Sequence, residues 1–245
     1  MLKAKPLQYN KQLIEYQIQH RPAVTRRIHL ELNDNGSLRI IAPRSMSRRA
    51  IHKTLQQKVS RVARFLVEAR TRQNERPVHC HVSGEMHLFL GQNYPLELIA
   101  KPGKRSCVDL IDGRIRIIMA DTRAKAVRKR LDRWYRQQAR EHFRARLERI
   151  SSFAAWTNGK IPPIRLRKMK RTWGSCSAAG IITLNPLLVK APPECVDYVI
   201  AHELCHLQEH NHGKPFYALQ AQLFPGWREA KASLQDRAHI YLDSA

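Results

Sequence analysis

The sequence predicts an α+β protein in which an N-terminal antiparallel β unit with one helix precedes a second domain of helices and a short sheet. We place the first over residues 1–120 and the second over residues 121–245. Apolar and polar residues alternate with the period of strands through much of the first part, whereas helical spacing begins at residue 121. A chain of 245 residues can bury a sizeable core in one or two domains.

Strands dominate the expected N-terminal domain. Alternation predicts strands at residues 14–18 and 28–32, and a turn-forming run joins the second of these to residues 38–40 as a hairpin. Ser47 can cap one helix whose apolar stripe extends to Leu66. Short strands are then expected at residues 78–82, 88–90, 94–99 and 108–118, the last of them folded about Asp112 and Gly113.

The second domain is expected to begin with a long helix over residues 121–150. Strands follow at residues 164–169 and 181–185. A buried apolar helix then starts in the run Ala191-Pro192-Pro193-Glu194, which places proline and a carboxylate in the first turn. Two further helical stretches are expected near residues 215–223 and 228–242.

The chain is strongly basic, with a net charge of +24. The predicted helix at residues 121–150 alone carries eleven Lys or Arg against four Asp or Glu. Such a field attracts polyanions such as nucleotides or nucleic acid, although a solvated Arg-rich surface explains it equally well. The sequence contains no RNA- or DNA-binding fingerprint such as an RRM or a zinc finger.

The five cysteines show no C-x-x-C spacing, which argues against a secreted disulfide framework and for a reducing compartment. The first residues lack the apolar core of a signal peptide, and no run approaches 18 apolar residues. We therefore expect a soluble cytoplasmic protein that does not enter a membrane. The oligomeric state is left open.

The motif His202-Glu203-Leu204-Cys205-His206 has the pattern H-E-x-x-H. On a helix, His202 and His206 lie on one face about 5–6 Å apart, so both can reach one metal ion. Glu203 lies beside that ion and can take a proton from a water molecule. Without its context, the pattern also suits a helix that happens to carry two histidines.

His212 is the expected third ligand, because Asn211 and Gly213 allow the helix to stop and the chain to fold back. Three imidazoles leave the fourth position of a zinc ion open. His210 and Glu229 remain rival ligands.

The segment Arg171-Thr172-Trp173-Gly174-Ser175-Cys176-Ser177 lies between the two strands predicted just upstream of the motif helix. We expect an active-site loop here, formed by Trp173, Gly174, Ser175 and Cys176. A tight hairpin whose tryptophan packs in the core explains the same residues.

His79, His81 and His87 raise a second metal-site hypothesis, because His79 and His81 would share one face of a strand. No cysteine or carboxylate completes a known ligand spacing with them, so this hypothesis is the weaker of the two.

Several segments together resemble the YgjP-like family of zinc metallopeptidases, which is related to the SprT-like and WLM proteases among the zincins. The resemblance rests on Trp173-Gly174-Ser175-Cys176-Ser177, Leu184-Asn185, Ala191-Pro192-Pro193, Asp197-Tyr198-Val199, the H-E-x-x-H motif and Asn211-His212. It extends upstream to Trp134-Tyr135, Tyr94-Pro95-Leu96, Leu90-Gly91 and the N-terminal strands, and so covers nearly the whole chain.

The resemblance implies a zincin-like catalytic domain over residues 121–245, with the H-E-x-x-H helix under a short sheet. It also implies Zn²⁺ as the cofactor, His202, His206 and His212 as its ligands, and Glu203 as the catalytic acid/base. One departure is that Arg171 and Thr172 are exchanged relative to the usual family order, so Arg171 receives no firm role. In addition, Glu209 stands where the related metzincin spacing has glycine.

The leading functional hypothesis is zinc-dependent hydrolysis of a peptide or protein substrate, with an extended peptide added to the strand at residues 181–185. A second hypothesis keeps the metal and makes the substrate a nucleoside triphosphate. A third is a basic nucleic-acid-associated protein whose metal site is secondary.

Overall fold

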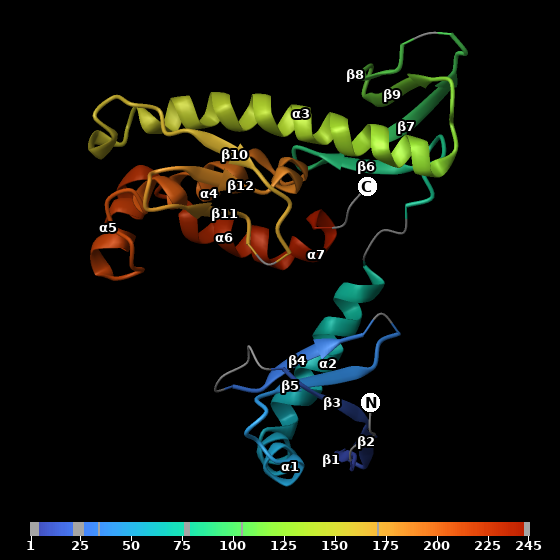
Figure 1. Cartoon of the computed structure of the whole chain (residues 1–245), viewed down its shortest axis with the longest axis vertical. Coiled ribbons are helices and arrows are strands. Elements are labelled where there is room, and N and C mark those ends of the chain that lie inside the picture. The colour runs from blue at the N-terminus through green and yellow to red at the C-terminus, as the bar shows by residue number, and fades with distance from the viewer. Residues whose placement is uncertain are drawn as a thin grey trace. The chain divides into compact units, whose positions relative to one another are not determined.

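The structure (Figure 1) is a computed structural model that describes residues 5–21, 27–33, 35–75, 79–103, 105–170 and 172–242. Its contacts divide the chain into two compact units, Met1–Arg76 and Pro77–Ala245, and each is described by itself. This division falls earlier than the boundary expected near residue 120. The reason is that the strands between residues 86 and 119 share one hydrophobic core with the helices that follow them.

The first unit contains two small sheets. β1 (Leu7–Tyr9) and β2 (Gln12–Ile14) form an antiparallel pair, while β5 (Leu38–Ala42) lies between β3 (Tyr16–His20) and β4 (His29–Leu32). The expected hairpin of β4 and β5 is confirmed, although one residue of its predicted turn, Asp34, lies outside the described residues. β3 runs parallel to β5, so the unit is not purely antiparallel. Alternation indicates which face a residue takes but not the direction of its strand.

Two helices replace the single helix expected after Ser47. α1 (Arg48–Gln57) is capped as predicted, because the Ser47 hydroxyl accepts a hydrogen bond from the Ala50 N–H at 3.3 Å. α1 ends at Lys58, whose backbone leaves the helical region (φ −117°, ψ 26°), and α2 (Val59–Asn74) begins there. The apolar stripe still packs into one core, to which both helices contribute: Ile51, Leu55, Val62 and Leu66.

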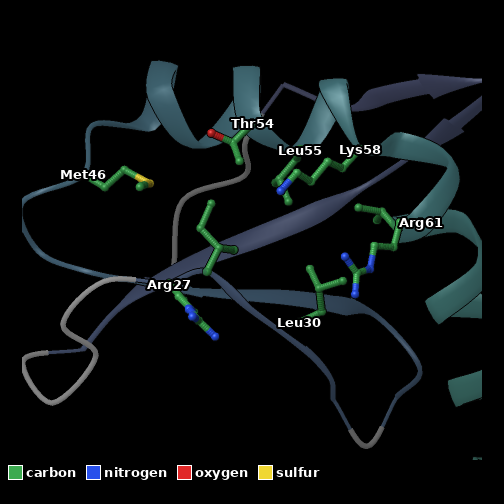
Figure 2. Close-up of a pocket in the computed structure, with 9 residues that line it drawn as sticks. Arg27, Leu30, Met46, Thr54, Leu55, Lys58 and Arg61 are labelled. Atoms are coloured by element: carbon green, nitrogen blue, oxygen red, sulfur yellow. The ribbon is translucent and has the colours of Figure 1, made fainter.

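A cavity of about 610 Å³ opens between these helices and the sheet of the first unit (Figure 2). Arg27, Lys58 and Arg61 give it a positive lining, and Lys58 and Arg61 extend into it from the helical side. The cavity's lining residues are Arg27, Ile28, Leu30, Met46, Thr54, Leu55, Lys58, Arg61 and Val62, with no histidine, cysteine or carboxylate among them. The lining therefore offers positive charge but none of the usual metal ligands.

The second unit begins with a four-stranded sheet in the order β6–β7–β9–β8. Its strands are β6 (Met86–Phe89), β7 (Gln92–Ala100), β8 (Cys107–Ile111) and β9 (Arg114–Met119). The predicted turn at residues 112–113 joins β8 to β9, but β7 and β9 are parallel. The strand expected at residues 78–82 does not form over its described part, residues 79–82, and Val78 lies outside the described residues.

Helix α3 (Ala124–Ser151) confirms the long helix expected from residue 121. One stripe of it is buried, whereas most of its Arg and Lys residues stay at least partly accessible. The buried stripe contains Val127, Leu131, Trp134, Tyr135, Ala139, Phe143, Leu147 and Ile150. Trp134 and Tyr135 are therefore core residues rather than a platform for bases.

A three-stranded sheet follows, in which β12 (Ile182–Leu184) lies between β10 (Ile164–Leu166) and β11 (Gly174–Cys176). β12 is parallel to β10 and antiparallel to β11. The two strands predicted at residues 164–169 and 181–185 are thus confirmed in shorter form. The segment expected to be a turn between them contains the edge strand β11, because Gly174, Ser175 and Cys176 pair with β12.

The remaining helices surround α4 (Pro193–Cys205), which follows the short 3₁₀ helix η2 (Pro186–Lys190). α4 contacts α3, β11, α5 (Lys214–Leu223) and α6 (Trp227–Asp236). The helix expected at residues 228–242 is divided, because the backbone at Arg237 (φ −99°, ψ 9°) separates α6 from α7 (Ala238–Tyr241). None of the described helices combines the length and apolar character that a bilayer crossing demands.

An ion-pair cluster fastens α4 to α3. The carboxylate of Asp197 on α4 accepts from Arg146 at 2.6 Å and from Arg149 at 2.7 Å. The Asp197 side chain is only 11% exposed, so loss of the carboxylate would leave Arg146 poorly solvated and without its partner.

We predict that Asp197→Ala lowers the free energy of unfolding by about 2 kcal/mol, because one buried partner of a charged network is removed. Urea denaturation measures the change. Glu148→Ala is the matched control, since the Arg144–Glu148 pair on α3 is exposed and such pairs contribute roughly 0–1 kcal/mol. Equal losses in the two variants would contradict the assignment.

Candidate metal centre

Helix α4 is buried on nearly all sides, as its apolar sequence predicted. Its first residue is Pro193 and its first turn carries Glu194, in agreement with the expected start. Cys195 and Cys205 near its two ends are fully buried, and burial raises the pKa of the Cys205 thiol to about 12. Because the helix is fixed by packing along its whole length, the side chains that it does present are held in place.

The helix ends within the H-E-x-x-H motif. His202 and Glu203 lie in the last turn, and His206 is the C-terminal capping residue. The indole N–H of Trp156, from the 3₁₀ helix η1 (Ala155–Thr157), donates to the Leu204 carbonyl at 2.9 Å. The Leu204 carbonyl also accepts from the Leu207 N–H at 3.2 Å, so the indole gives this carbonyl of the helix end a second partner.

His202, His206 and His212 converge. Each offers one ring nitrogen, and these three nitrogens lie within 4.8 Å of one another. The Nε2 atoms of His202 and His212 are 3.0 Å apart. The chain therefore folds back after α4 as expected, whereas His210 and Glu229, the rival ligands, do not belong to this cluster.

Two hydrogen bonds orient the first two imidazoles. Nδ1 of His202 lies 2.9 Å from Oε1 of Gln220, and Nδ1 of His206 lies 3.0 Å from the Glu209 carbonyl oxygen. Each Nδ1 donates to its oxygen, so each neutral ring has its lone pair on Nε2. Burial lowers the pKa of His202 to about 4 and also lowers that of His206, which keeps both rings neutral near pH 7.

This donor set fits a borderline divalent ion. Neutral imidazole nitrogens are typical ligands of zinc, and hydrogen bonds to the opposite ring nitrogens are the usual support of such ligands. His212 is exposed, whereas His202 and His206 are partly buried, so the cluster is accessible from its His212 side.

Phe216 forms an apolar wall behind the three histidines. Its ring is fully buried, and its centroid lies 4.9, 4.7 and 4.6 Å from those of His202, His206 and His212. The sequence patterns predicted no role for Phe216 or Gln220. Their spacing of four residues in a stretch predicted to be helical was the available clue, since it places both on one face of α5.

Glu203 is enclosed against strand β11. A Cβ atom added to Gly174 would lie 2.5 Å from Oε1 of Glu203, so only glycine allows the strand this close to the carboxylate. Oε2 of Glu203 is buried and makes no hydrogen bond to the described residues. Burial raises the pKa of Glu203 to about 8.

The expected active-site loop contributes unequally to this arrangement. Gly174 contacts Glu203, and Cys176 lies close enough for the charge of Glu203 to raise its pKa further, after burial. Ser175, between them in the strand, points to the opposite face and is exposed. Trp173 packs edge-on against Tyr241 at 6.5 Å, which favours a core role for it. Arg171 lies outside the described residues.

Comparisons with known proteins identify the family of the chain. A family model described as a YgjP-like metallopeptidase domain matches residues 26–237. A search of curated proteins found no match. Among solved structures, the chain is similar to the crystal structure of the metallopeptidase zymogen of Pyrococcus abyssi abylysin, with 23% identity and a TM-score of 0.37 over 40% of this chain and 96% of that chain. Because the family model covers well over half of the sequence, the chain belongs to the YgjP-like family and carries its metallopeptidase domain.

Proposed function

We propose that this metallopeptidase domain is a zinc-dependent peptidase that uses His202, His206 and His212 as ligands and Glu203 as acid/base. The observation that carries the proposal is the convergence of three imidazole nitrogens at the end of α4, where the last turn of the helix also carries Glu203, enclosed against β11. A zinc ion at such a site supplies Lewis-acid chemistry, which makes water a nucleophile near pH 7 and polarises a carbonyl group.

Glu203 has the environment of a proton carrier. One oxygen of its buried carboxyl group makes no hydrogen bond to the described residues. Its pKa, raised to about 8, lies close to neutral pH, where a general acid–base group is most effective. Oε2 is therefore available to accept a proton from the attacking water and to return it to the leaving amine. The packing of Gly174 against Oε1 keeps bulk water away from the other side of the carboxylate.

The edge strand β11 is the proposed docking strand for an extended peptide. The strand at residues 181–185 was expected to have this role, but β12 is paired on both sides and has no free edge. β11 is paired only with β12 in the described sheet, and Gly174 brings it to Glu203. A peptide paired with β11 would lie along the catalytic carboxylate.

The two competing hypotheses remain expectations from the sequence. A nucleoside triphosphate phosphohydrolase would use the same histidines and Glu203, so only the substrate distinguishes it from a peptidase. Assays of phosphate release from nucleoside triphosphates, run beside the peptide assays below, separate the two. Steeply salt-dependent binding to DNA or RNA would support nucleic-acid association.

We predict that the wild-type chain, loaded with zinc and desalted, retains metal that His212→Ala loses. Elemental mass spectrometry gives the zinc content per chain. His210→Ala is the matched control, because this exposed histidine lies two residues away and outside the cluster. If His212→Ala retains as much zinc as His210→Ala, the three-histidine assignment is incorrect.

We predict that Glu203→Gln retains its zinc but loses peptide hydrolysis by at least about 100-fold, since general acid–base catalysis contributes 10²–10⁴-fold. Cleavage of a quenched fluorescent peptide library measures turnover. Glu194→Gln, on the exposed first turn of the same helix, should keep full activity. Full activity of Glu203→Gln would refute the role proposed for Glu203.

We predict that, in the metal-free chain kept in EDTA, Glu203 makes the free energy of unfolding depend on pH. The pKa of Glu203 is raised from 4.5 to about 8 in the folded state, so unfolding above pH 5 releases a proton and the wild type loses stability as the pH rises to 8. Glu203→Gln lacks this proton. Its free energy of unfolding should therefore gain up to about 3 kcal/mol relative to wild type between pH 5 and pH 8, as measured by urea denaturation. A difference that is independent of pH would show that Glu203 does not titrate in this range.

A further inference from the structure

A second cluster of metal-ligand side chains lies outside the H-E-x-x-H site. It contains His79, Glu85 and His87, whose ligand atoms lie within 4.8 Å of one another. Nδ1 of His79 is in hydrogen-bond contact with Oε1 of Glu85, and Nε2 of His87 lies 3.4 Å from the same oxygen. The rings of His79 and His87 are stacked with their centroids 4.6 Å apart. Glu85 is the carboxylate that the sequence pattern alone did not connect with these histidines.

The backbone of residues 80–82 holds the Glu85 carboxylate in place. Oε2 of Glu85 accepts hydrogen bonds from the N–H groups of Cys80 at 2.9 Å and His81 at 2.6 Å. These bonds leave Oε1 directed at the two imidazoles. His81 adopts a left-handed conformation (φ 60°), which a non-glycine residue takes only rarely. The loop is therefore shaped around the carboxylate, in place of the strand expected there.

The environment of His87 gives independent support for a bound ion. His87 is fully buried on strand β6, and neither of its ring nitrogens makes a hydrogen bond to the described residues. A buried imidazole whose two ring nitrogens lack hydrogen bonds is costly, and a ligand bond to a bound ion would give one of these nitrogens a partner.

A simple ion pair explains the cluster less completely. An ion pair between His79 and Glu85 leaves both buried ring nitrogens of His87 without a partner, whereas a bound ion would take one of them as a ligand. A tetrahedral ion with ligand bonds of about 2.0–2.1 Å needs donor atoms about 3.3–3.4 Å apart. The Nε2–Oε1 separation of 3.4 Å between His87 and Glu85 meets this requirement, whereas the closer contact between Nδ1 of His79 and Oε1 of Glu85 would have to lengthen when an ion binds.

We propose that His79, Glu85 and His87 form a second site for a divalent transition-metal ion, with zinc as the first candidate. Two imidazoles and one carboxylate suit zinc and also cobalt, nickel or ferrous iron, whereas magnesium and calcium prefer oxygen ligands. The site shares no residue with the cluster of His202, His206 and His212, so it does not depend on the peptidase proposal.

The test uses the full chain with the first cluster removed by His202→Ala, His206→Ala and His212→Ala together. After loading with zinc and desalting, this triple variant should retain about one zinc per chain by elemental mass spectrometry. Adding Glu85→Gln or His79→Ala should each abolish that zinc. His142→Ala in the same background is the matched control, because His142 is a partly buried histidine of the same unit that lies outside both clusters.

A second measurement covers the case in which the triple variant does not fold, as judged by circular dichroism. In the otherwise wild-type chain, Glu85→Gln and His79→Ala should each lower the zinc content by one ion per chain, while His142→Ala leaves it unchanged. Zinc that is absent from a folded triple variant, or that survives both Glu85→Gln and His79→Ala, would overturn the proposal. If the wild-type chain binds zinc only at His79, Glu85 and His87 and none at His202, His206 and His212, the result would count against the peptidase proposal and leave this one intact.

Discussion

The near-complete burial of helix α4 is the constraint on which the rest of the second unit depends. An apolar helix of this kind is stable only when other elements cover every side of it. Helix α3, strand β11 and helices α5 and α6 provide that cover. The ion pairs of Asp197 with Arg146 and Arg149 stabilise the contact with α3. The Trp156 indole donates a hydrogen bond to the C-terminal end of α4. His202 and His206 at that end are therefore carried by a helix that is covered by its neighbours.

The same cover supplies the surroundings of the reacting groups. Helix α5 contributes both the Gln220 oxygen, which fixes the tautomer of His202, and the Phe216 ring, which backs all three histidines. Strand β11 contributes the backbone against which Glu203 rests. Helix α5 and strand β11 therefore both cover α4 and position groups at its end, so packing and chemistry depend on the same contacts.

Local features of this protein could be read from the sequence. The spacing of His202 and His206, the cap at Ser47 and the turn before β9 each depend on residues that are neighbours in the chain. The α+β class followed from the two hydrophobic periods. The sequence did not predict the directions of β3 and β7, the helix break at Lys58 or the division between the units. Tertiary packing decides these features. Phe216, Gln220 and Glu85 were missed for the same reason, since their partners are brought to them only by folding.

The two buried cysteines of α4 can report on how often the structure around the helix opens. Cys195 and Cys205 lie near opposite ends of α4 and are fully covered, so a thiol reagent in solvent cannot reach them in the folded chain. The raised pKa of each thiol further suppresses the reactive thiolate. Alkylation at these positions therefore requires an opening of the structure around α4. The rate at which each cysteine is alkylated consequently records how often its end of the helix becomes exposed, and the two rates together distinguish fraying at the histidine end from opening of the whole unit.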